Sequence, residues 1–207
     1  MRYRLTSLVP FLAAMTLVVA ASNYLVQFPF EHLGLGEILT WGAFTYPVAF
    51  LVNDLTNRRF GMQAARTVVA LGFVLAIVAS VWLATPRIAI ASGSAFLLAQ
   101  LLDATVFDRL RRSAWWKAPF ISTLLGSVID TVLFFGLAFA APFAAIDAFF
   151  NMPDGSLPFP VALFGTEIPL WMSLAVGDFC VKIVVGLAML LPYGALLRVL
   201  KPVSQQA

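Results

Sequence analysis

Long apolar stretches alternate with short polar or basic segments along the whole chain. A helix of about 20 apolar residues crosses the hydrocarbon core of a bilayer, so stretches of this length predict transmembrane helices. The pattern therefore predicts an all-α, polytopic membrane protein with a single transmembrane domain of six helices over residues 1–207. The predicted spans cover about 5–28, 36–57, 64–83, 88–107, 119–141 and 171–192.

Two segments outside this regular pattern need a separate interpretation. The short basic start of the chain resembles that of a signal peptide, but the apolar run from Leu5 to Phe28 lacks an A-x-A cleavage pattern. We therefore expect a retained first helix. The connection from Pro142 to Pro169 is longer than the others, and we expect a short interfacial helix around Phe143–Phe150.

Basic residues are distributed unevenly between the predicted loops. If the N-terminus is inside, six crossings place nearly all of them on the cytoplasmic side, and only Arg87 falls outside. This bias predicts that both termini lie in the cytoplasm. The residues on the predicted cytoplasmic side are Arg2, Arg4, Arg58, Arg59, Arg66, Arg109, Arg111, Arg112, Lys117, Arg198 and Lys201.

Composition supports a membrane protein and excludes several kinds of site. The sequence is 61% hydrophobic and 11% charged, which is too apolar for a soluble domain. One cysteine, Cys180, excludes a disulfide framework or a cysteine-based metal site, and one histidine, His32, excludes a multi-histidine centre. We expect no cofactor, no metal and no enzymatic activity. We attribute the net charge of +3 to topology rather than to nucleic-acid binding.

Three charged residues lie deep within predicted spans. Asp178 and Lys182 are four residues apart in the last span, so they share one helical face. Such charges are costly in a bilayer and are kept with a partner or beside a water-lined cavity. The pair either lines a cavity or neutralises itself and only fixes helix packing. Asp130 has no basic residue on its own helix, so its partner must be another helix, a ligand or a proton.

All but one of the predicted spans carry a polar stripe, and such stripes should converge on one cavity because hydrocarbon rejects them. Amides and carboxylates pair with planar N–H and C=O edges, and aromatic rings stack on flat ligands. This chemistry favours a purine-like or pterin-like heterocycle over a sugar or a bare ion, although Asn23 and Gln27 could instead form interhelical hydrogen bonds. The candidate substrate-binding residues are Asn23, Gln27, Trp41, Tyr46, Phe96, Gln100, Asp130, Phe134, Asp178 and Lys182.

Charge within the predicted core does not balance. Asp130 and Asp178 face a single Lys182, so one negative charge must be protonated or offset by a cation. We hypothesise that one of these aspartates binds and releases a proton during transport. We also expect a gating or cytoplasmic network of Asn53, Asp54 and Asp103. Local pairing with the basic cluster Arg109–Arg112 is our expectation for both Asp103 and Asp108.

Several short blocks of residues match one known family of membrane proteins. They are NYLVQFP at 23–29, TWGAFTYP at 40–47, VNDLTNRRFG at 52–61, SGSAF at 92–96, QLLD at 100–103, GSVIDT at 126–131, and Lys182 with PYG at 192–194. In these blocks the chain resembles the queuosine precursor transporter family of the vitamin uptake transporter group. The resemblance implies a six-helix importer of 7-cyano-7-deazaguanine in the bacterial inner membrane, with its 7-aminomethyl relative as a second candidate substrate. The expected partners are a deazaguanine base and the bilayer, and we expect a secondary carrier that is a monomer or homodimer.

Two other functions remain as alternatives. A substrate-binding subunit of an ATPase-driven vitamin importer commonly carries an alanine-x-x-x-alanine motif on its first helix, and Val9, Ala13 and Leu17 break that spacing. An intramembrane aspartyl-type hydrolase needs two facing aspartates, for which Asp130 and Asp178 qualify. Lys182 on the face of Asp178 would keep that carboxylate ionised and prevent a shared-proton dyad.

Overall fold

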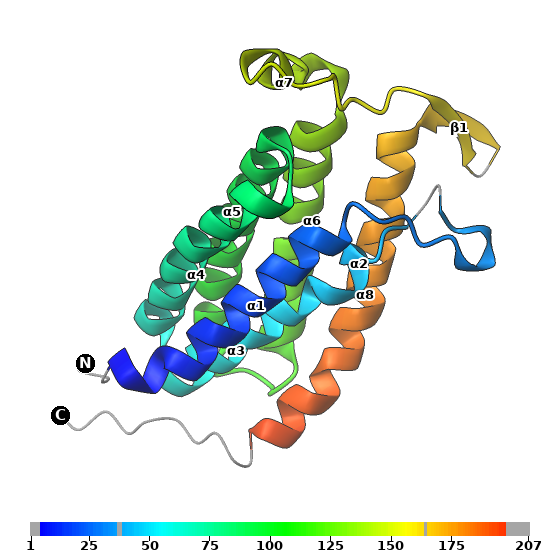
Figure 1. Ribbon diagram of the computed structural model, residues 1–207. Helices are drawn as coiled ribbons and strands as arrows, with labels where there is room; N and C mark the ends of the chain where they lie inside the picture. Colours follow the sequence, from blue (N-terminus) through cyan, green and yellow to red (C-terminus); the bar gives the residue numbers. More distant parts are fainter. Residues whose placement is uncertain (1–4, 37–38, 164, 198–207) are drawn as a thin grey trace.

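A computed structural model describes residues 5–36, 39–163 and 165–197, and the described chain is a bundle of helices with one small hairpin (Figure 1). The α-helices are α1 (Val9–Leu25), α2 (Gly42–Thr45), α3 (Pro47–Phe60), α4 (Met62–Leu83), α5 (Pro86–Leu110), α6 (Lys117–Phe139), α7 (Ala145–Phe149) and α8 (Leu170–Leu196). Short 3-10 turns cover Leu5–Leu8, His32–Gly34 and Ala141–Phe143. The antiparallel strands are β1 (Pro160–Leu163) and β2 (Thr166–Pro169).

Four helices within the described residues are long and apolar enough to cross a membrane. They are Thr6–Leu25, Pro86–Leu110, Lys117–Phe139 and Leu170–Leu196. A shorter apolar helix covers Met62–Val74. The chain is therefore a largely helical, multi-pass membrane protein. The third, fourth and fifth predicted spans agree with α4, α5 and α6 to within about three residues at each end.

The second predicted span, 36–57, is wrong at its start. Pro29 forms an isolated β-bridge with Thr40, and Gly34 has a φ of +70° that an α-helix does not accommodate, so the described residues 29–36 and 39–41 are not α-helical. The helix also has a break between α2 and α3, because Pro47 lacks the N–H that would continue the hydrogen-bond ladder. It ends at Phe60, where Gly61 takes a φ of +89°.

The C-terminal part differs from expectation in two places. Pro192 was the predicted end of the last span, yet α8 continues through it to Leu196. A proline inside a transmembrane helix is tolerated where neighbours satisfy the freed backbone group. The long connection contains the expected short helix, α7, and also the β1–β2 hairpin, which the apolar pattern did not predict. Gly165 in the hairpin turn has a φ of +82°.

Helices pack closely around α3 and α6. The pairs α5–α6, α1–α4 and α6–α8 lie against each other, and α3 contacts α1, α4, α5 and α8. Gly126 on α6 permits one of the closest approaches, because a Cβ built there would lie 2.6 Å from Cε1 of Phe50 on α3. Phe50 is fully buried, so its ring has little freedom to move aside.

The two ends of the bundle differ in charge. The start of α1 and the end of α8 lie at one end, and α7 with the β1–β2 hairpin lies at the other (Figure 1). We call the first the basic end, because Arg58 and Arg111 exchange hydrogen bonds with each other's carbonyl oxygens there, at 2.7 and 3.3 Å. Asp108 pairs with Arg111 at 3.1 Å, which confirms the local pairing expected for it. Arg2, Arg4, Arg198 and Lys201 lie outside the described residues.

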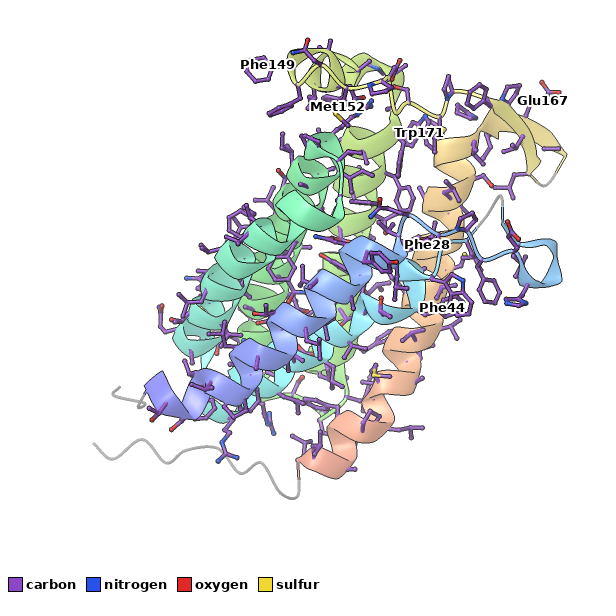
Figure 2. The ribbon with its side chains drawn as sticks, in the orientation of Figure 1. Phe28, Phe44, Phe149, Met152, Glu167 and Trp171 are labelled. Carbon is purple, nitrogen blue, oxygen red and sulfur yellow. The ribbon has the colours of Figure 1, made fainter. Side chains whose placement is uncertain are left out.

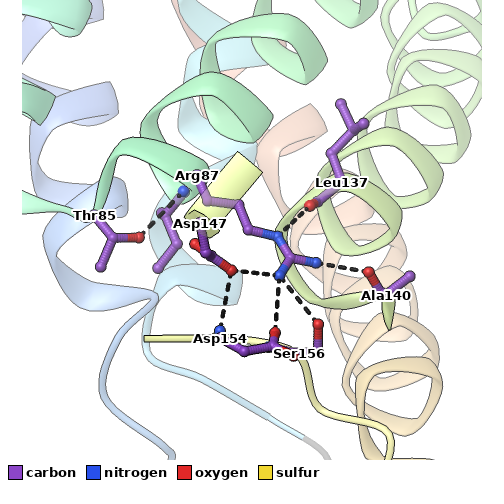
Figure 3. A network of polar contacts seen from close by, with 9 residues as sticks. Thr85, Arg87, Leu137, Ala140, Asp147, Asp154 and Ser156 are labelled. Atoms are coloured by element: carbon purple, nitrogen blue, oxygen red, sulfur yellow. Dashed lines mark hydrogen bonds and ion pairs between the residues drawn. The ribbon is translucent and has the colours of Figure 1, made fainter. Parts of the chain in front are cut away.

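Arg87 organises the opposite end (Figure 3). Its side chain is 1% exposed, and its guanidinium donates to the carbonyls of Leu137 and Ala140 at the end of α6. It also pairs with Asp147 of α7 at 2.7 Å and donates to Ser156 at 3.1 Å. The first turn of α5, the last turn of α6 and the following loop are thus held by one buried cation. Figure 2 shows Phe149 and Met152 projecting from the same end, and Glu167 at the hairpin.

A second carboxylate stands at the edge of the Arg87 network. Asp154 lies 3.5 Å from the Arg87 guanidinium and is exposed to solvent. Hydrogen bonds from the hydroxyl and backbone N–H of Ser156, together with the charge of Arg87, lower the pKa of Asp154. This carboxylate therefore stays ionised at neutral pH.

Candidate functional site

Lys182 of α8 is the centre of a buried charged cluster. Its side chain is 3% exposed, and Nζ lies 2.6 Å from Oδ2 of Asp130 on α6 and 2.5 Å from Oδ2 of Asp178 on its own helix. Thr131 donates to Asp178 at 2.9 Å and accepts from Lys182 at 3.2 Å. Of the three partners that the sequence leaves open for Asp130, the structure shows a side chain of another helix.

The charged cluster lines a cavity between α1, α2, α5, α6 and α8. The Asp178–Lys182 pair therefore lines a cavity, and ligand binding in that cavity stays a prediction. The space left for water inside the cavity is about 30 Å³, enough for one or two molecules. A planar base would fit only after the lining side chains move. The lining residues are Ser22, Asn23, Val26, Gly42, Tyr46, Ser92, Asp130, Phe134, Asp178 and Lys182.

Tyr46 covers the charged cluster from the break between α2 and α3. The Lys182 ammonium lies 5.0 Å from the centre of its ring, a cation–π distance. The Tyr46 hydroxyl is buried close to Asp130, but it forms no hydrogen bond of normal geometry within the described chain. The same holds for the second oxygen of Asp130, Oδ1. Two residues that line the cavity, Tyr46 and Asp130, thus each have a buried polar atom without a hydrogen bond of normal geometry. Such atoms are available to bind a polar ligand.

The other wall of the cavity is polar and comes from α1 and α5. Ser92 donates a hydrogen bond to the side-chain oxygen of Asn23, and the hydroxyls of Ser22 and Thr45 are 2.8 Å apart. Gly42 allows this contact of α2 with α1, since a Cβ there would lie 2.9 Å from Val26. These bonds fix the amide of Asn23 at the edge of the cavity.

Several lining residues were missed from the sequence, namely Ser22, Gly42, Ser92 and the supporting Thr131. The available signal was spacing: Ser92 precedes the candidate Phe96 by four residues on the same helical face. Thr131 follows Asp130 directly, and only the packing of α6 against α8 shows that it contacts Asp178. Small hydroxyl and glycine residues are too frequent in membrane helices to be selected by pattern alone.

Some predicted site residues lie outside the cavity. Gln27 is exposed, and its amide donates to the backbone oxygen of Asn23 at 3.3 Å. Trp41 is 40% exposed and packs against Phe30 in a loop, because the helix begins after it. Phe96 is buried in the apolar core beside Asn23 and Ser92. Gln100 is fully buried nearer the basic end.

A second polar cluster joins α3, α5 and α6 below the cavity. Asn53 donates to Oδ2 of Asp103 at 2.8 Å and to the backbone oxygen of Gln100 at 3.0 Å. Ser122 donates to Asp54 at 3.4 Å. Asn53 and Asp103 are therefore in contact, Asp54 contacts α6 instead, and a gating role for the three residues stays a prediction.

One expectation about this cluster is wrong. Asp103 does not pair with the basic cluster at 109–112, because it lies on the buried face of α5 and is 0% exposed. Its partner is Asn53 of α3. Among the described residues, no three His, Cys, Asp or Glu side chains gather as metal ligands would.

Comparison with known proteins places this geometry in context. A family model described as putative vitamin uptake transporter matches residues 40–85 and 79–196. The queuosine precursor transporter of Escherichia coli (strain K12) is 38% identical over 206 residues, which cover 89% of this chain and 83% of that protein. The probable queuosine precursor transporter of Haemophilus influenzae is 33% identical over 218 residues, covering 88% and 83%. No solved structure matches the chain.

Proposed function

The chain belongs to the vitamin uptake transporter family that includes queuosine precursor transporters, and on this premise we propose that it imports queuosine precursors across the bacterial inner membrane. The proposed substrates are 7-cyano-7-deazaguanine and its 7-aminomethyl relative. Its relatives are named as transporters, which accords with a carrier rather than an enzyme. The buried Asp130–Lys182–Asp178 cluster beside a cavity is the observation that carries the proposal.

The cavity offers groups that match a flat guanine-like base. Oδ1 of Asp130 can accept from the ring N–H and the exocyclic amine, and the Asn23 amide can donate to the carbonyl edge. Phe134 and Tyr46 provide aromatic faces for stacking. Gln27 and Trp41 lie outside the cavity, so we assign them no direct contact with a bound base.

Charge within the cavity suits either a cationic substrate or a proton. Two carboxylates surround one ammonium group, which leaves one negative charge buried. An aminomethyl cation or a proton would neutralise it. We therefore keep the secondary, proton-coupled carrier as the mechanism, with Asp130 or Asp178 as the group that takes up the proton.

We propose six crossings within one domain, with both termini in the cytoplasm. The start of α1 and the end of α8 lie at the same end of the bundle, as an even number of crossings requires (Figure 1). The C-terminal ends of α3 and α5 carry three arginines at this end of the bundle, Arg58, Arg59 and Arg111, whereas Arg87 is buried at the other end. This asymmetry supports the positive-inside orientation.

The hydrolase alternative loses support from the geometry of Lys182. Its ammonium lies within 2.6 Å of both carboxylates, so each is held by a cation. An aspartyl dyad needs two carboxyls that share one proton and face each other without such a cation. An ATPase-driven importer differs from a secondary carrier in its energy source, so uptake measured with and without ATP distinguishes the two.

Uptake into proteoliposomes without ATP tests the proposed function. The purified protein should accumulate radiolabelled 7-cyano-7-deazaguanine under an inward proton gradient, and Lys182→Ala should abolish this uptake. Asp108→Asn is the matched control, because Asp108 pairs with Arg111 at the basic end, away from the cavity. Uptake that requires an added ATPase would contradict the secondary carrier, and absence of deazaguanine binding by the wild type would contradict the substrate class.

A further inference from the structure

Two buried carboxyl groups face each other between the cavity and the basic end. Asp54 on α3 is 2% exposed and Asp103 on α5 is 0% exposed. Asp54 accepts from the Ser122 hydroxyl of α6 at 3.4 Å, and Asp103 accepts at 2.8 Å from Asn53, the residue next to Asp54, so both carboxyls belong to one buried polar cluster. Asp54 lies about 12 Å along the helix from Tyr46, so this pair is separate from the Lys182 cluster.

No cation in the described chain neutralises this pair. None of the ion pairs among the described residues includes Asp54 or Asp103. Arg58 and Arg111 lie nearby at the basic end, but each donates to a backbone carbonyl of the other. Tyr193 of α8 is the remaining titratable group that faces the pair. Two adjacent ionised carboxylates without a cation would repel each other strongly in a buried site.

A proton between the two carboxyls resolves this conflict. Ionised carboxylates only accept hydrogen bonds, so two of them in one buried cluster without a cation are stabilised when a proton lies between them. We propose that Asp54 and Asp103 share one proton and form a second proton-binding site, separate from the Lys182 cluster. Its role in transport rests on the proposed function, whereas the binding of the proton does not.

Other buried groups around the pair support a site for a mobile proton. The Tyr193 hydroxyl is buried, has no hydrogen-bond partner in the described chain, and lines a small cavity together with Asp54. That cavity has room for about one water molecule. Oδ1 of Asp103 and Oδ1 of Asn53 are likewise buried without a partner among the described residues. A hydroxyl and a water molecule both donate and accept, so Tyr193 and one water in this cavity would relay a proton that the pair releases.

Further buried polar groups lie on α5 and α6 near each of the two sites. Ser127 on α6 lies three residues from Asp130, and Gln100 on α5 lies three residues from Asp103, each about 4.5 Å along its helix. The Ser127 hydroxyl and both amide atoms of Gln100 are buried and lack partners within the described ranges. Buried polar groups are normally hydrogen-bonded, so several unsatisfied ones on neighbouring helices are unusual. They are the groups that a proton passing from Asp130 towards the basic end would meet.

Infrared spectroscopy tests proton binding without any transport assay. The wild type in detergent at neutral pH should show the C=O stretch of protonated carboxyl groups, and Asp54→Asn/Asp103→Asn should reduce that band by the contribution of one carboxyl, leaving any contribution from Asp130 or Asp178. Asparagine has nearly the shape of a protonated aspartate, so the variant should fold, and its thermal unfolding midpoint in detergent would verify this. Asp108→Asn, which removes a partly exposed carboxylate, should keep the band. An unchanged band in the double variant would overturn the proposal.

Proteoliposomes then test the role in coupling. The double variant should exchange labelled for unlabelled base as the wild type does, yet lose accumulation driven by an inward proton gradient. Proton-driven accumulation at the wild-type level would overturn the coupling role. Accumulation by the wild type that follows a sodium gradient, and is lost in the double variant, would show sodium as the ligand and also overturn it. If the wild type takes up no base, the proposed function fails, and the infrared band still decides the proton site.

Discussion

The Nζ atom of Lys182 on α8 lies 2.6 Å from Oδ2 of Asp130 on α6, and both side chains are 3% exposed. This single contact joins two transmembrane helices through opposite charges in a medium that disfavours either charge alone. It also explains how Asp130 can be buried without a basic residue on its own helix. The stability of the bundle and the chemistry of the cavity therefore depend on the same side chain.

Replacement of Lys182 by methionine should destabilise the bundle strongly. The substitution keeps much of the side-chain volume but leaves Asp130 and Asp178 as adjacent buried carboxylates. Loss of one partner of a buried ion pair typically costs about 3–5 kcal/mol. Thermal unfolding in detergent would measure the change. Asp108→Asn, which removes a partly exposed pair at the basic end, should cost less than about 1 kcal/mol; equal losses in the two variants would contradict this prediction.

Tyr46→Phe should separate the contribution of the Tyr46 hydroxyl from that of its ring. The phenylalanine keeps the aromatic face 5.0 Å from Lys182, so folding should be nearly unchanged. If the buried hydroxyl donates to the substrate, its loss should weaken binding by about 0.5–1.5 kcal/mol, or roughly two- to tenfold. Calorimetric titration with 7-cyano-7-deazaguanine would measure this. Tyr46→Ala should weaken binding further, and unchanged affinity in Tyr46→Phe would remove the hydroxyl from the site.

Much of the charged site could be inferred from single residues in their helices. Asp130, Asp178 and Lys182 stand out because ionisable residues are rare at this depth, and the structure places all three on one cavity. The expectation that Asp130 needs a partner from elsewhere followed from its own helix alone. Helix periodicity and burial cost therefore suffice for the centre of the site.

Which residues lie at the edge of the site depends on the backbone conformation and helix packing, and helix periodicity does not predict these. Gly34 has a left-handed conformation, the described residues 29–36 and 39–41 form no α-helix, and Trp41 lies outside the cavity. Asp103 shows the same limit, since its sequence neighbours are basic but its spatial neighbour is Asn53, 50 positions away. Which partner a buried polar group takes is decided by helix packing, which a one-dimensional pattern does not specify.

Gly126→Ala should destabilise the protein through a steric conflict. The added Cβ would lie 2.6 Å from Cε1 of Phe50 and 3.4 Å from the backbone oxygen of Ala99, and the Phe50 ring is fully buried. Overpacking of this kind usually costs about 1–3 kcal/mol. Thermal unfolding should therefore show a lower midpoint. Gly136→Ala on the same helix is the matched control, because a Cβ there meets nothing within 4 Å.

A compensating substitution makes the Gly126 prediction specific. Phe50→Leu shortens the side chain that the new Cβ would meet, so Gly126→Ala combined with Phe50→Leu should recover part of the loss relative to the sum of the two single variants. Losses that simply add would show that the two residues do not conflict. A loss in Gly136→Ala as large as that in Gly126→Ala would point to backbone effects instead of the contact with Phe50.

Arg87→Met should loosen the end of the bundle that carries α7. The substitution removes a buried cation that binds Leu137, Ala140, Asp147 and Ser156, and it leaves the Asp147 carboxylate buried without its ion pair. The expected cost is about 3–5 kcal/mol, concentrated in the segment after α6. Hydrogen exchange should show faster exchange in α7 than in α3. Asp154→Asn should change neither the stability nor the exchange rate of α7, since Asp154 is solvent-exposed at the edge of the network. Slowed or unchanged exchange in α7 of Arg87→Met would contradict the role assigned to Arg87.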